Sequence, residues 1–253
     1  VFLKTYWSYK FAYKNLAPMK YFDTVIFLAL LLIISCSKPA VEYKEIAEKS
    51  LNEEKVELAI NNLNLLIEKY PSDSLASYAQ YKLALIYLNW KNDLVKGYDA
   101  LNKTLNEYKN TKQAQMADDQ INQFPEWIIN QSESLRKRKL IKISINHLEY
   151  LVENFSENVL APKAQYMIGD IYMNDLRDFK IAIQEYRKVT DIYSGSSQEP
   201  HAQFMIGYIY ANVINDEKSA KIEYQEFLKK FPNHELAPSV KFEIDYLGKS
   251  IEE

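Results

Sequence analysis

Apolar residues recur at helical spacing along most of the chain. In one segment they occupy positions i, i+3, i+4, i+7 and i+8 and are Ala202, Met205, Ile206, Ile209 and Tyr210. This spacing places them on one stripe of an α-helix. The segment 220–231 repeats the stripe, and the intervening "NVINDEKS" has the composition of a turn. We therefore predict a helix–turn–helix hairpin whose apolar faces need neighbouring hairpins to bury them.

The hairpin pattern is repeated along the chain. Ala202 lies 38 residues after Ala164, and Ala117 lies 38 residues after Ala79. A small residue follows the alanine in three units as Ala84, Gly169 and Gly207, and an aromatic residue follows as Tyr87, Tyr172 and Tyr210. A second series of small residues consists of Ala59, Gly97, Ser144, Ala182 and Ala220. Each is followed 11 residues later by an aromatic residue, namely Tyr70, Tyr108, Phe155, Tyr193 and Phe231.

These two series predict an all-α solenoid of about five helical hairpins plus a C-terminal helix. The units are expected near 41–70, 79–108, 117–155, 164–193 and 202–231, with a closing helix at 240–253. The third unit is irregular, because 47 residues separate Ala117 from Ala164 and Pro125 falls in the aromatic position. A proline there ends or kinks a helix. We interpret 117–140 as a distorted repeat with an insertion.

The small positions indicate where helices pack. Gly169 and Gly207 are expected where the two helices of a hairpin approach most closely. Ala84, Ala59, Ala182, Ala220 and the aromatic residues Tyr87, Tyr172 and Tyr210 are assigned to packing within and between repeats.

The order Leu/Ile, Gly/Ala, Tyr, then Ala, Tyr and Pro resembles the tetratricopeptide repeat, whose usual period is about 34 residues. The spacing of 38 residues in this chain exceeds that period by four. One of the four additional residues falls in the turn of the hairpin and three fall in the "YPSDSLAS"-type link between units. That link, with "YP" or "FP" and then "LAP", is similar to two bacterial envelope families. One is the lipoprotein of the outer-membrane barrel-assembly machinery (BamD-like), and the other is the periplasmic Tol-Pal coordinator (YbgF-like).

This resemblance covers 41–253 and implies a non-enzymatic scaffold that binds other envelope proteins. Outer-membrane protein assembly, with barrel-assembly components as partners, is the leading role. A Tol-Pal or cell-division coordinator is the alternative within this class, although that family usually carries an N-terminal coiled coil and no heptad run appears here. A lipoprotein that captures peptide or glycan for uptake is the alternative from another class.

The N-terminal region has the features of a lipoprotein signal. The apolar run 25–34 is shorter than the roughly 20 residues that cross a bilayer and fits a signal-peptide core. The "IISC" that ends at Cys36 resembles the bacterial lipobox, which implies that this cysteine is acylated and anchors the chain in the bilayer. A short uncleaved signal anchor is the alternative.

We accordingly assign 1–18 to a non-native or upstream extension, 19–36 to the signal peptide and 37–40 to a tether. The resemblance places the mature protein in a bacterial envelope, anchored by lipid and, as the leading expectation, at the outer membrane facing the periplasm.

Charge and composition argue against several other functions. Without residues 1–36 the chain has 27 basic and 33 acidic residues, which disfavours nucleic-acid binding. Its five glycines are scattered, so no glycine-rich loop can hold a phosphate. His147, His201 and His234 lie in different units without paired spacing and are interpreted as surface or groove residues. We predict no catalytic residue, no metal site and no cofactor.

Two rows of residues are candidates for a partner groove, because the resemblance implies that the first helix of each hairpin lines the binding face. The aromatic row is Tyr81, Tyr166 and Phe204, and the amide row is Asn89, Asn174 and Asn212. The aromatic side chains either line the groove or belong to the core. The asparagines either pair with a bound peptide or, as the preferred interpretation, cap helices in the left-handed conformation.

A basic cluster, "RKRK" at 136–139, stands out in an acidic chain. We interpret it as a solvated helix start. The alternative is a contact with anionic lipid or an acidic partner.

Overall fold

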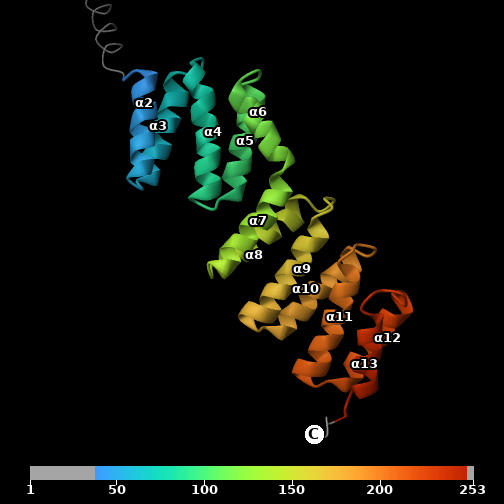
Figure 1. The fold of residues 1–253 in the computed structure, drawn as a ribbon. Coiled ribbons are helices and arrows are strands. Elements are labelled where there is room, and N and C mark those ends of the chain that lie inside the picture. The colour runs from blue at the N-terminus through green and yellow to red at the C-terminus, as the bar shows by residue number, and fades with distance from the viewer. Residues whose placement is uncertain (1–37, 250–253) are drawn as a thin grey trace, which may run out of the picture. The chain divides into compact units, whose positions relative to one another are not determined.

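A computed structural model describes residues 38–249 (Figure 1). Within this range it has 12 α-helices and no β-strand, so the predicted all-α fold is confirmed. No helix in this range is long and apolar enough to cross a membrane. The predicted signal peptide, with Cys36, and the last residues of the predicted closing helix lie outside the described residues.

The chain divides into two compact units, 1–83 and 84–253, and the division falls inside one helix. The described part of the first unit contains α2 (Ala40–Asn52), α3 (Val56–Lys69) and the first part of α4 (Ser74–Asn89). Helices α2 and α3 form a hairpin. The Tyr78 hydroxyl in α4 donates a 2.7 Å hydrogen bond to Glu48 Oε1 in α2.

The second unit contains the rest of α4 and the helices that follow it. These are α5 (Leu94–Glu107), α6 (Lys112–Asn122), α7 (Phe124–Lys137), α8 (Ile141–Asn154), α9 (Ala161–Ile171), α10 (Phe179–Ile192), α11 (Glu199–Ile209), α12 (Glu217–Lys230) and α13 (Ala237–Tyr246). Short π-helical turns η1 (Tyr172–Leu176) and η2 (Tyr210–Ile214) extend α9 and α11.

Small residues lie where the paired helices of a hairpin meet. A Cβ atom on Gly169 would lie 2.7 Å from the Tyr186 ring in α10, and one on Gly207 would lie 2.5 Å from the Tyr224 ring in α12. Both tyrosines are fully buried. The fully buried small side chains at the remaining predicted packing positions are Ala59, Ala84, Ala182 and Ala220. The close helix approach expected from the sequence is therefore present at these glycines.

The tyrosines in the aromatic positions have a second role, since their backbone closes the hairpin turn. The carbonyl oxygens of Tyr87, Tyr172 and Tyr210 accept hydrogen bonds from backbone N–H groups six residues later, at 2.8–2.9 Å. Those donors belong to Asp93, Asp178 and Asp216. The side chains of the tyrosines themselves are half-buried.

Each of these aspartates also caps the helix that follows. Asp178 Oδ1 accepts from the Ile181 N–H at 3.1 Å, and Asp93 and Asp216 make the same bond in their own units. Such a bond satisfies one of the backbone donors that a helix start leaves unpaired. The two remaining hairpins have tighter turns, because the backbone N–H groups of Lys55 and Leu140 bond to carbonyl oxygens only five residues back.

The aromatic residues of the second series end the second helices. Each stands at the C-cap, and its carbonyl oxygen accepts a bond from the backbone N–H three residues later. These residues are Tyr70, Tyr108, Phe155, Tyr193 and Phe231. The sequence pattern thus marks the boundary between successive units.

The irregular third unit differs from the expected distorted repeat with an insertion. Helix α6 ends at Asn122 and packs on α5, whereas α7 begins at Phe124 and pairs with α8. Pro125 stands in the first turn of α7, where its missing N–H costs nothing. The additional residues therefore form a helix of their own, and two short helices replace one.

Two further expectations are corrected by the helix ends. The basic cluster 136–139 lies at the end of α7 and not at a helix start, and positive side chains there suit the negative end of the helix dipole. The closing helix begins at Ala237, earlier than predicted, and ends at Tyr246.

Candidate functional site

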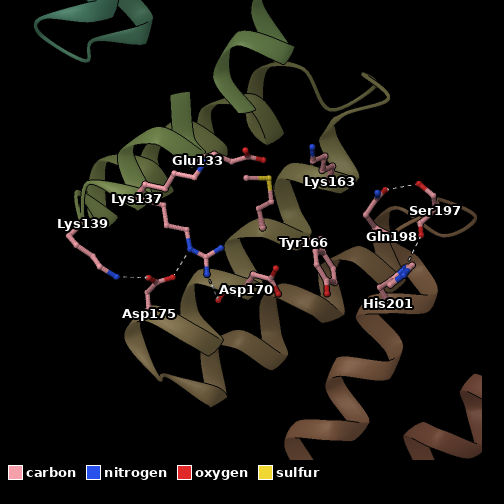
Figure 2. Close-up of a pocket in the computed structure, with 12 residues that line it drawn as sticks. Glu133, Lys137, Lys139, Lys163, Tyr166, Asp170, Asp175, Ser197, Gln198 and His201 are labelled. Atoms are coloured by element: carbon pink, nitrogen blue, oxygen red, sulfur yellow. Dashed lines mark hydrogen bonds and ion pairs between the residues drawn. The ribbon is translucent and has the colours of Figure 1, made fainter. Parts of the chain in front are cut away.

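The first helices of three successive hairpins, α7, α9 and α11, border a groove of about 760 Å³ in the second unit (Figure 2). Its lining residues are Glu133, Arg136, Lys137, Lys139, Lys163, Tyr166, Met167, Asp170, Asp175, Ser197, Gln198 and His201. A volume of this size is typical of pockets that bury a ligand or a few side chains.

Tyr166 is the aromatic residue of the groove. Its ring centroid lies 5.2 Å from that of Tyr186 in α10 and 6.4 Å from that of His201 in α11. Burial, aided by the nearby Asp170 carboxylate, raises the pKa of Tyr166 to about 12. The hydroxyl therefore stays protonated at neutral pH and can donate a hydrogen bond to a bound chain.

An arginine from the basic cluster holds one wall of the groove together. Arg136 Nε donates to Asp175 Oδ2 at 2.6 Å, and a terminal guanidinium nitrogen lies 3.4 Å from the Asp170 carbonyl oxygen. The Asp170 carboxylate accepts from the Tyr186 hydroxyl at 2.6 Å, and burial raises the pKa of this carboxyl. Arg136 therefore joins two neighbouring hairpins of the second compact unit, and its side chain is only 28% exposed.

The groove retains charges that are not neutralised by neighbours. Within residues 38–249, the ammonium groups of Lys137 and Lys163 have no ion-pair partner, and neither has the Glu133 carboxylate. Lys139 lies 3.9 Å from Asp175, a loose pair. Outside the Arg136–Asp175 pair, the three lysines of the lining outnumber the Glu133 and Asp170 carboxylates, so the balance of charge in the groove is positive.

The predicted aromatic row is only partly assembled in this groove. Tyr166 lines it, whereas Phe204 packs on Tyr224, 6.1 Å away between ring centroids, beside the core of α12 and α13. Tyr81 lies in the first compact unit and is half-buried. Tyr166 packs on Tyr186 in the same way, so both rings touch the core of their hairpin, and Tyr166 lines the groove as well.

The preferred interpretation of the asparagines as left-handed caps is wrong. Asn89, Asn174 and Asn212 are exposed, and none has a positive φ. The left-handed residues stand three positions later, at Asn92, Arg177 and Asn215, because the turn closes on the aspartate that follows each of them. Asn89 Nδ2 instead donates to the Leu85 carbonyl oxygen at 2.9 Å, and Asn212 makes the equivalent bond to Tyr208 at 3.3 Å. The alternative role, pairing with a peptide, stays a prediction.

His147 is neither a surface nor a groove residue, contrary to the sequence interpretation. It is 2% exposed in α8, and its Nδ1 lies 2.9 Å from the Ile143 carbonyl oxygen. Burial lowers the pKa of the ring, so it is neutral at physiological pH. His201 and His234, from adjacent units, lie next to each other, which their separation in sequence did not indicate.

Buried glutamines are structural residues that the sequence reasoning did not single out. Gln165 Nε2 donates to Glu185 Oε2 at 2.7 Å, and Gln203 Nε2 donates to Glu223 Oε2 at 2.8 Å. Both bonds connect the first helix of a hairpin to the second. The repeated Ala-Gln pair in the sequence was the available signal for them.

Three segments of the chain match the sequence profile of the tetratricopeptide repeat, at 78–111, 163–196 and 201–234. Together with the helical hairpins, they define the fold as an all-α tetratricopeptide-repeat solenoid. Proteins with these repeats generally bind protein partners, and the fold is typically a non-enzymatic scaffold.

Among solved structures, the chain is similar to a tetratricopeptide repeat protein from Parabacteroides merdae, with 12% identity, a TM-score of 0.35, and coverage of 82% of this chain and 73% of that one. It is also similar to MamA residues 41 to the end from Desulfovibrio magneticus RS-1, with 18% identity, a TM-score of 0.33, and coverage of 78% and 97%. No match was found among curated protein sequences. At these scores the two structures say nothing about the partner of this chain.

Proposed function

We propose that this chain is a protein-binding scaffold and that the groove bordered by α7, α9 and α11 holds a segment of its partner. The observation that carries this proposal is the groove itself, in which three first helices present an aromatic ring beside available ammonium groups. A rigid ring that is half-buried loses little entropy when it becomes fully buried, which suits an interface anchor.

The chemistry of the lining describes the segment that fits. Lys137 and Lys163 favour an acidic side chain, while Tyr166 and the buried Met167 offer an apolar contact. The protonated Tyr166 hydroxyl can donate to a backbone carbonyl of the bound segment. The proposed ligand is therefore a protein segment that combines an acidic residue with an apolar one.

We further propose that the scaffold acts in a bacterial envelope, anchored through acylated Cys36, and that it serves outer-membrane protein assembly. The support for this finer proposal is sequence alone, namely the short apolar run, the "IISC" motif and the "YP…LAP" links between units. A Tol-Pal or cell-division role and an uptake role are the rival outcomes. Labelling cells with a palmitate analogue tests the anchor, since wild type should be labelled and Cys36→Ala should not.

The groove is tested by photo-crosslinking in living cells. A crosslinking amino acid at position 197, an exposed lining position with no assigned contact to the partner, should yield discrete protein adducts, and the same group at the exposed position 229 in α12 should not. Adding Tyr166→Ala should remove the adducts, because truncation of an aromatic anchor often costs about 2 kcal/mol or more in binding. Phe242→Ala is the matched control, since this ring is 59% exposed on α13, outside the groove lining.

Circular dichroism separates a binding defect from unfolding. The Tyr166→Ala chain should keep its helical signal and lose its adducts. Adducts that persist in a folded Tyr166→Ala chain would remove the groove from the mechanism. If the Tyr166→Ala chain loses its helical signal together with its adducts, Tyr166 belongs to the core and not to the binding surface.

A further inference from the structure

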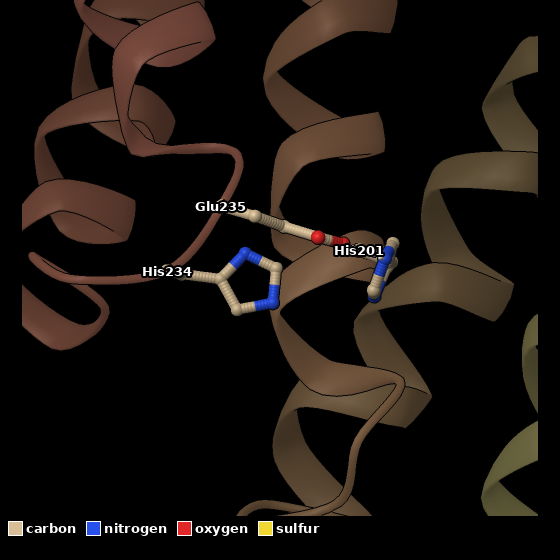
Figure 3. Close-up of side chains that lie close together, drawn as sticks. All are labelled: His201, His234 and Glu235. Atoms are coloured by element: carbon tan, nitrogen blue, oxygen red, sulfur yellow. Dashed lines mark ion pairs between the residues drawn. The ribbon is translucent and has the colours of Figure 1, made fainter.

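Two histidines from neighbouring repeat units come together beside the groove (Figure 3). His201 stands in the first turn of α11, and His234 lies in the link between α12 and α13. Their ring centroids are 5.3 Å apart, and the rings are nearly perpendicular at 88°. Glu235 brings its Oε1 atom to 3.9 Å from His201 Nε2. One ligand atom from each of the three residues lies within 4.8 Å of the other two.

His201 is oriented for coordination. Its Nδ1 atom lies 3.3 Å from the Ser197 carbonyl oxygen. Because a carbonyl can only accept, the proton of the neutral ring belongs on Nδ1, which leaves the Nε2 lone pair available. This is the arrangement of metal-binding histidines, whose second nitrogen usually donates to a carbonyl or a carboxylate.

His234 is held by aromatic neighbours but has a competing hydrogen bond. Its ring centroid lies 6.0 Å from that of Phe227 and 6.5 Å from that of Phe231. Its Nδ1 accepts from the Leu236 backbone N–H at 3.2 Å. Coordination through either ring nitrogen ends this bond, because Nδ1 then carries a proton or binds the ion itself. Metal binding at this histidine therefore replaces a hydrogen bond at the start of α13.

We propose that His201, His234 and Glu235 form a binding site for a divalent transition-metal ion, with Zn²⁺ as the best match. Two imidazole nitrogens and one carboxylate oxygen make up a known three-ligand set for zinc, with a fourth position left for water. Imidazole ligands suit zinc, copper and nickel, whereas calcium and magnesium prefer oxygen ligands alone. The donor set therefore selects the class of ion.

The side chains have room to close around an ion. Zinc–ligand bonds are about 2.0–2.2 Å long, so the three donor atoms have to move closer together. The His201 side chain is 43% exposed and that of Glu235 is 78% exposed, so both can change rotamer without disturbing the core. A bound ion joins the beginning of α11 to the link before α13 and leaves one coordination position facing solvent.

The site is tested on the full chain in detergent, with Cys36→Ser in every sample so that no thiol competes for metal. Zn²⁺ is titrated against a chromophoric chelator, and Co²⁺ replaces Zn²⁺ to report tetrahedral coordination by its visible absorption. We expect one Zn²⁺ per chain. His201→Gln and His234→Gln should each weaken binding roughly tenfold or more, and Glu235→Gln should weaken it less, because its carboxylate is the most exposed of the three ligands.

Glu226→Gln is the matched control, since it removes one exposed carboxylate from α12 that is not among the three clustered ligands. It should bind Zn²⁺ like the reference chain. Zn²⁺ should also raise the melting temperature of the reference chain, because ligands that bind only the folded state stabilise it. The proposal is overturned if the reference chain binds no Zn²⁺, or if a folded His201→Gln/His234→Gln chain binds it equally well.

Discussion

Single glycines set the distance between helices in the last two full hairpins. A Cβ atom at Gly207 would lie 2.5 Å from a ring carbon of Tyr224, closer than real Cβ atoms approach other atoms. The Tyr186 ring occupies the same place beside Gly169. A large buried tyrosine on the second helix is thus matched by a missing side chain on the first, which is how a close-packed core is filled.

Gly207→Ala should therefore destabilise the protein. Alanine is normally favoured over glycine within a helix by roughly 0.5–1 kcal/mol. Here the added methyl group overlaps the Tyr224 ring, and overpacking of this kind costs about 1–3 kcal/mol. Urea unfolding of the full chain, followed by circular dichroism, should show a lower midpoint for the variant.

Lys229→Ala, an exposed substitution in α12, is the control and should leave the urea midpoint nearly unchanged. A midpoint raised by Gly207→Ala would mean that the Tyr224 ring moves aside freely. The close helix contact would then not be what selects glycine at this position.

At the scale of the element, a repeated turn defines three of the hairpins. A residue with positive φ, at 92, 177 or 215, is followed by an aspartate that closes the turn with its N–H and caps the next helix with its side chain. In the turns at Glu54 and Lys139 the closing backbone hydrogen bond spans five residues and not six. No side chain caps the second helix in these two hairpins. Turn length and helix capping therefore vary together in this chain.

Asp178→Ala should weaken the hairpin of α9 and α10. Loss of an N-cap side chain typically costs about 1 kcal/mol, because a backbone N–H at the helix start loses its partner. Asp178→Asn should cost less, since the amide oxygen can still accept from the Ile181 N–H. Thermal unfolding measured by circular dichroism should rank wild type first, then Asn, then Ala.

The exposed Lys180 lies in the first turn of the same helix and provides the comparison. Lys180→Ala should change the melting temperature little. An equal loss in Asp178→Ala and Lys180→Ala would show that the cap contributes nothing measurable to stability.

At the scale of the whole molecule, each hairpin contacts mainly its neighbours in sequence. Contacts run from α7 to α8, from α8 to α9, and onward to α13, one helix after the next. In such arrays stability is approximately a sum of terms for the repeats and for the interfaces between adjacent repeats. A local change should therefore spread only a short distance along the chain.

Hydrogen exchange of the Gly207→Ala chain should show this locality. Amides in α11, α12 and α13 should lose protection, those in α10 less, and those in α2 and α3 should keep their wild-type rates. Mass spectrometry of peptides from the wild-type and variant chains provides the measurement. A uniform loss of protection would show that the described chain unfolds as one cooperative unit.

The sequence by itself determined the local structure. Helical periodicity around Ala202, small residues such as Gly207, and closing aromatics such as Phe231 predict helix class, pairing within hairpins and the ends of units. These features could be predicted because each depends on residues within one hairpin, through helical spacing, turn chemistry and close contact between paired helices.

Only the tertiary structure decided what the surfaces between units contain. Tyr166 and Phe204 occupy equivalent sequence positions, and each packs on the buried tyrosine of its own hairpin, Tyr186 or Tyr224, yet only Tyr166 is among the residues that line the groove. His201 and His234 meet because a link between helices brings the second beside the first turn of α11. Helical periodicity describes one helix at a time, so it carries no information about which side chains adjacent units bring together.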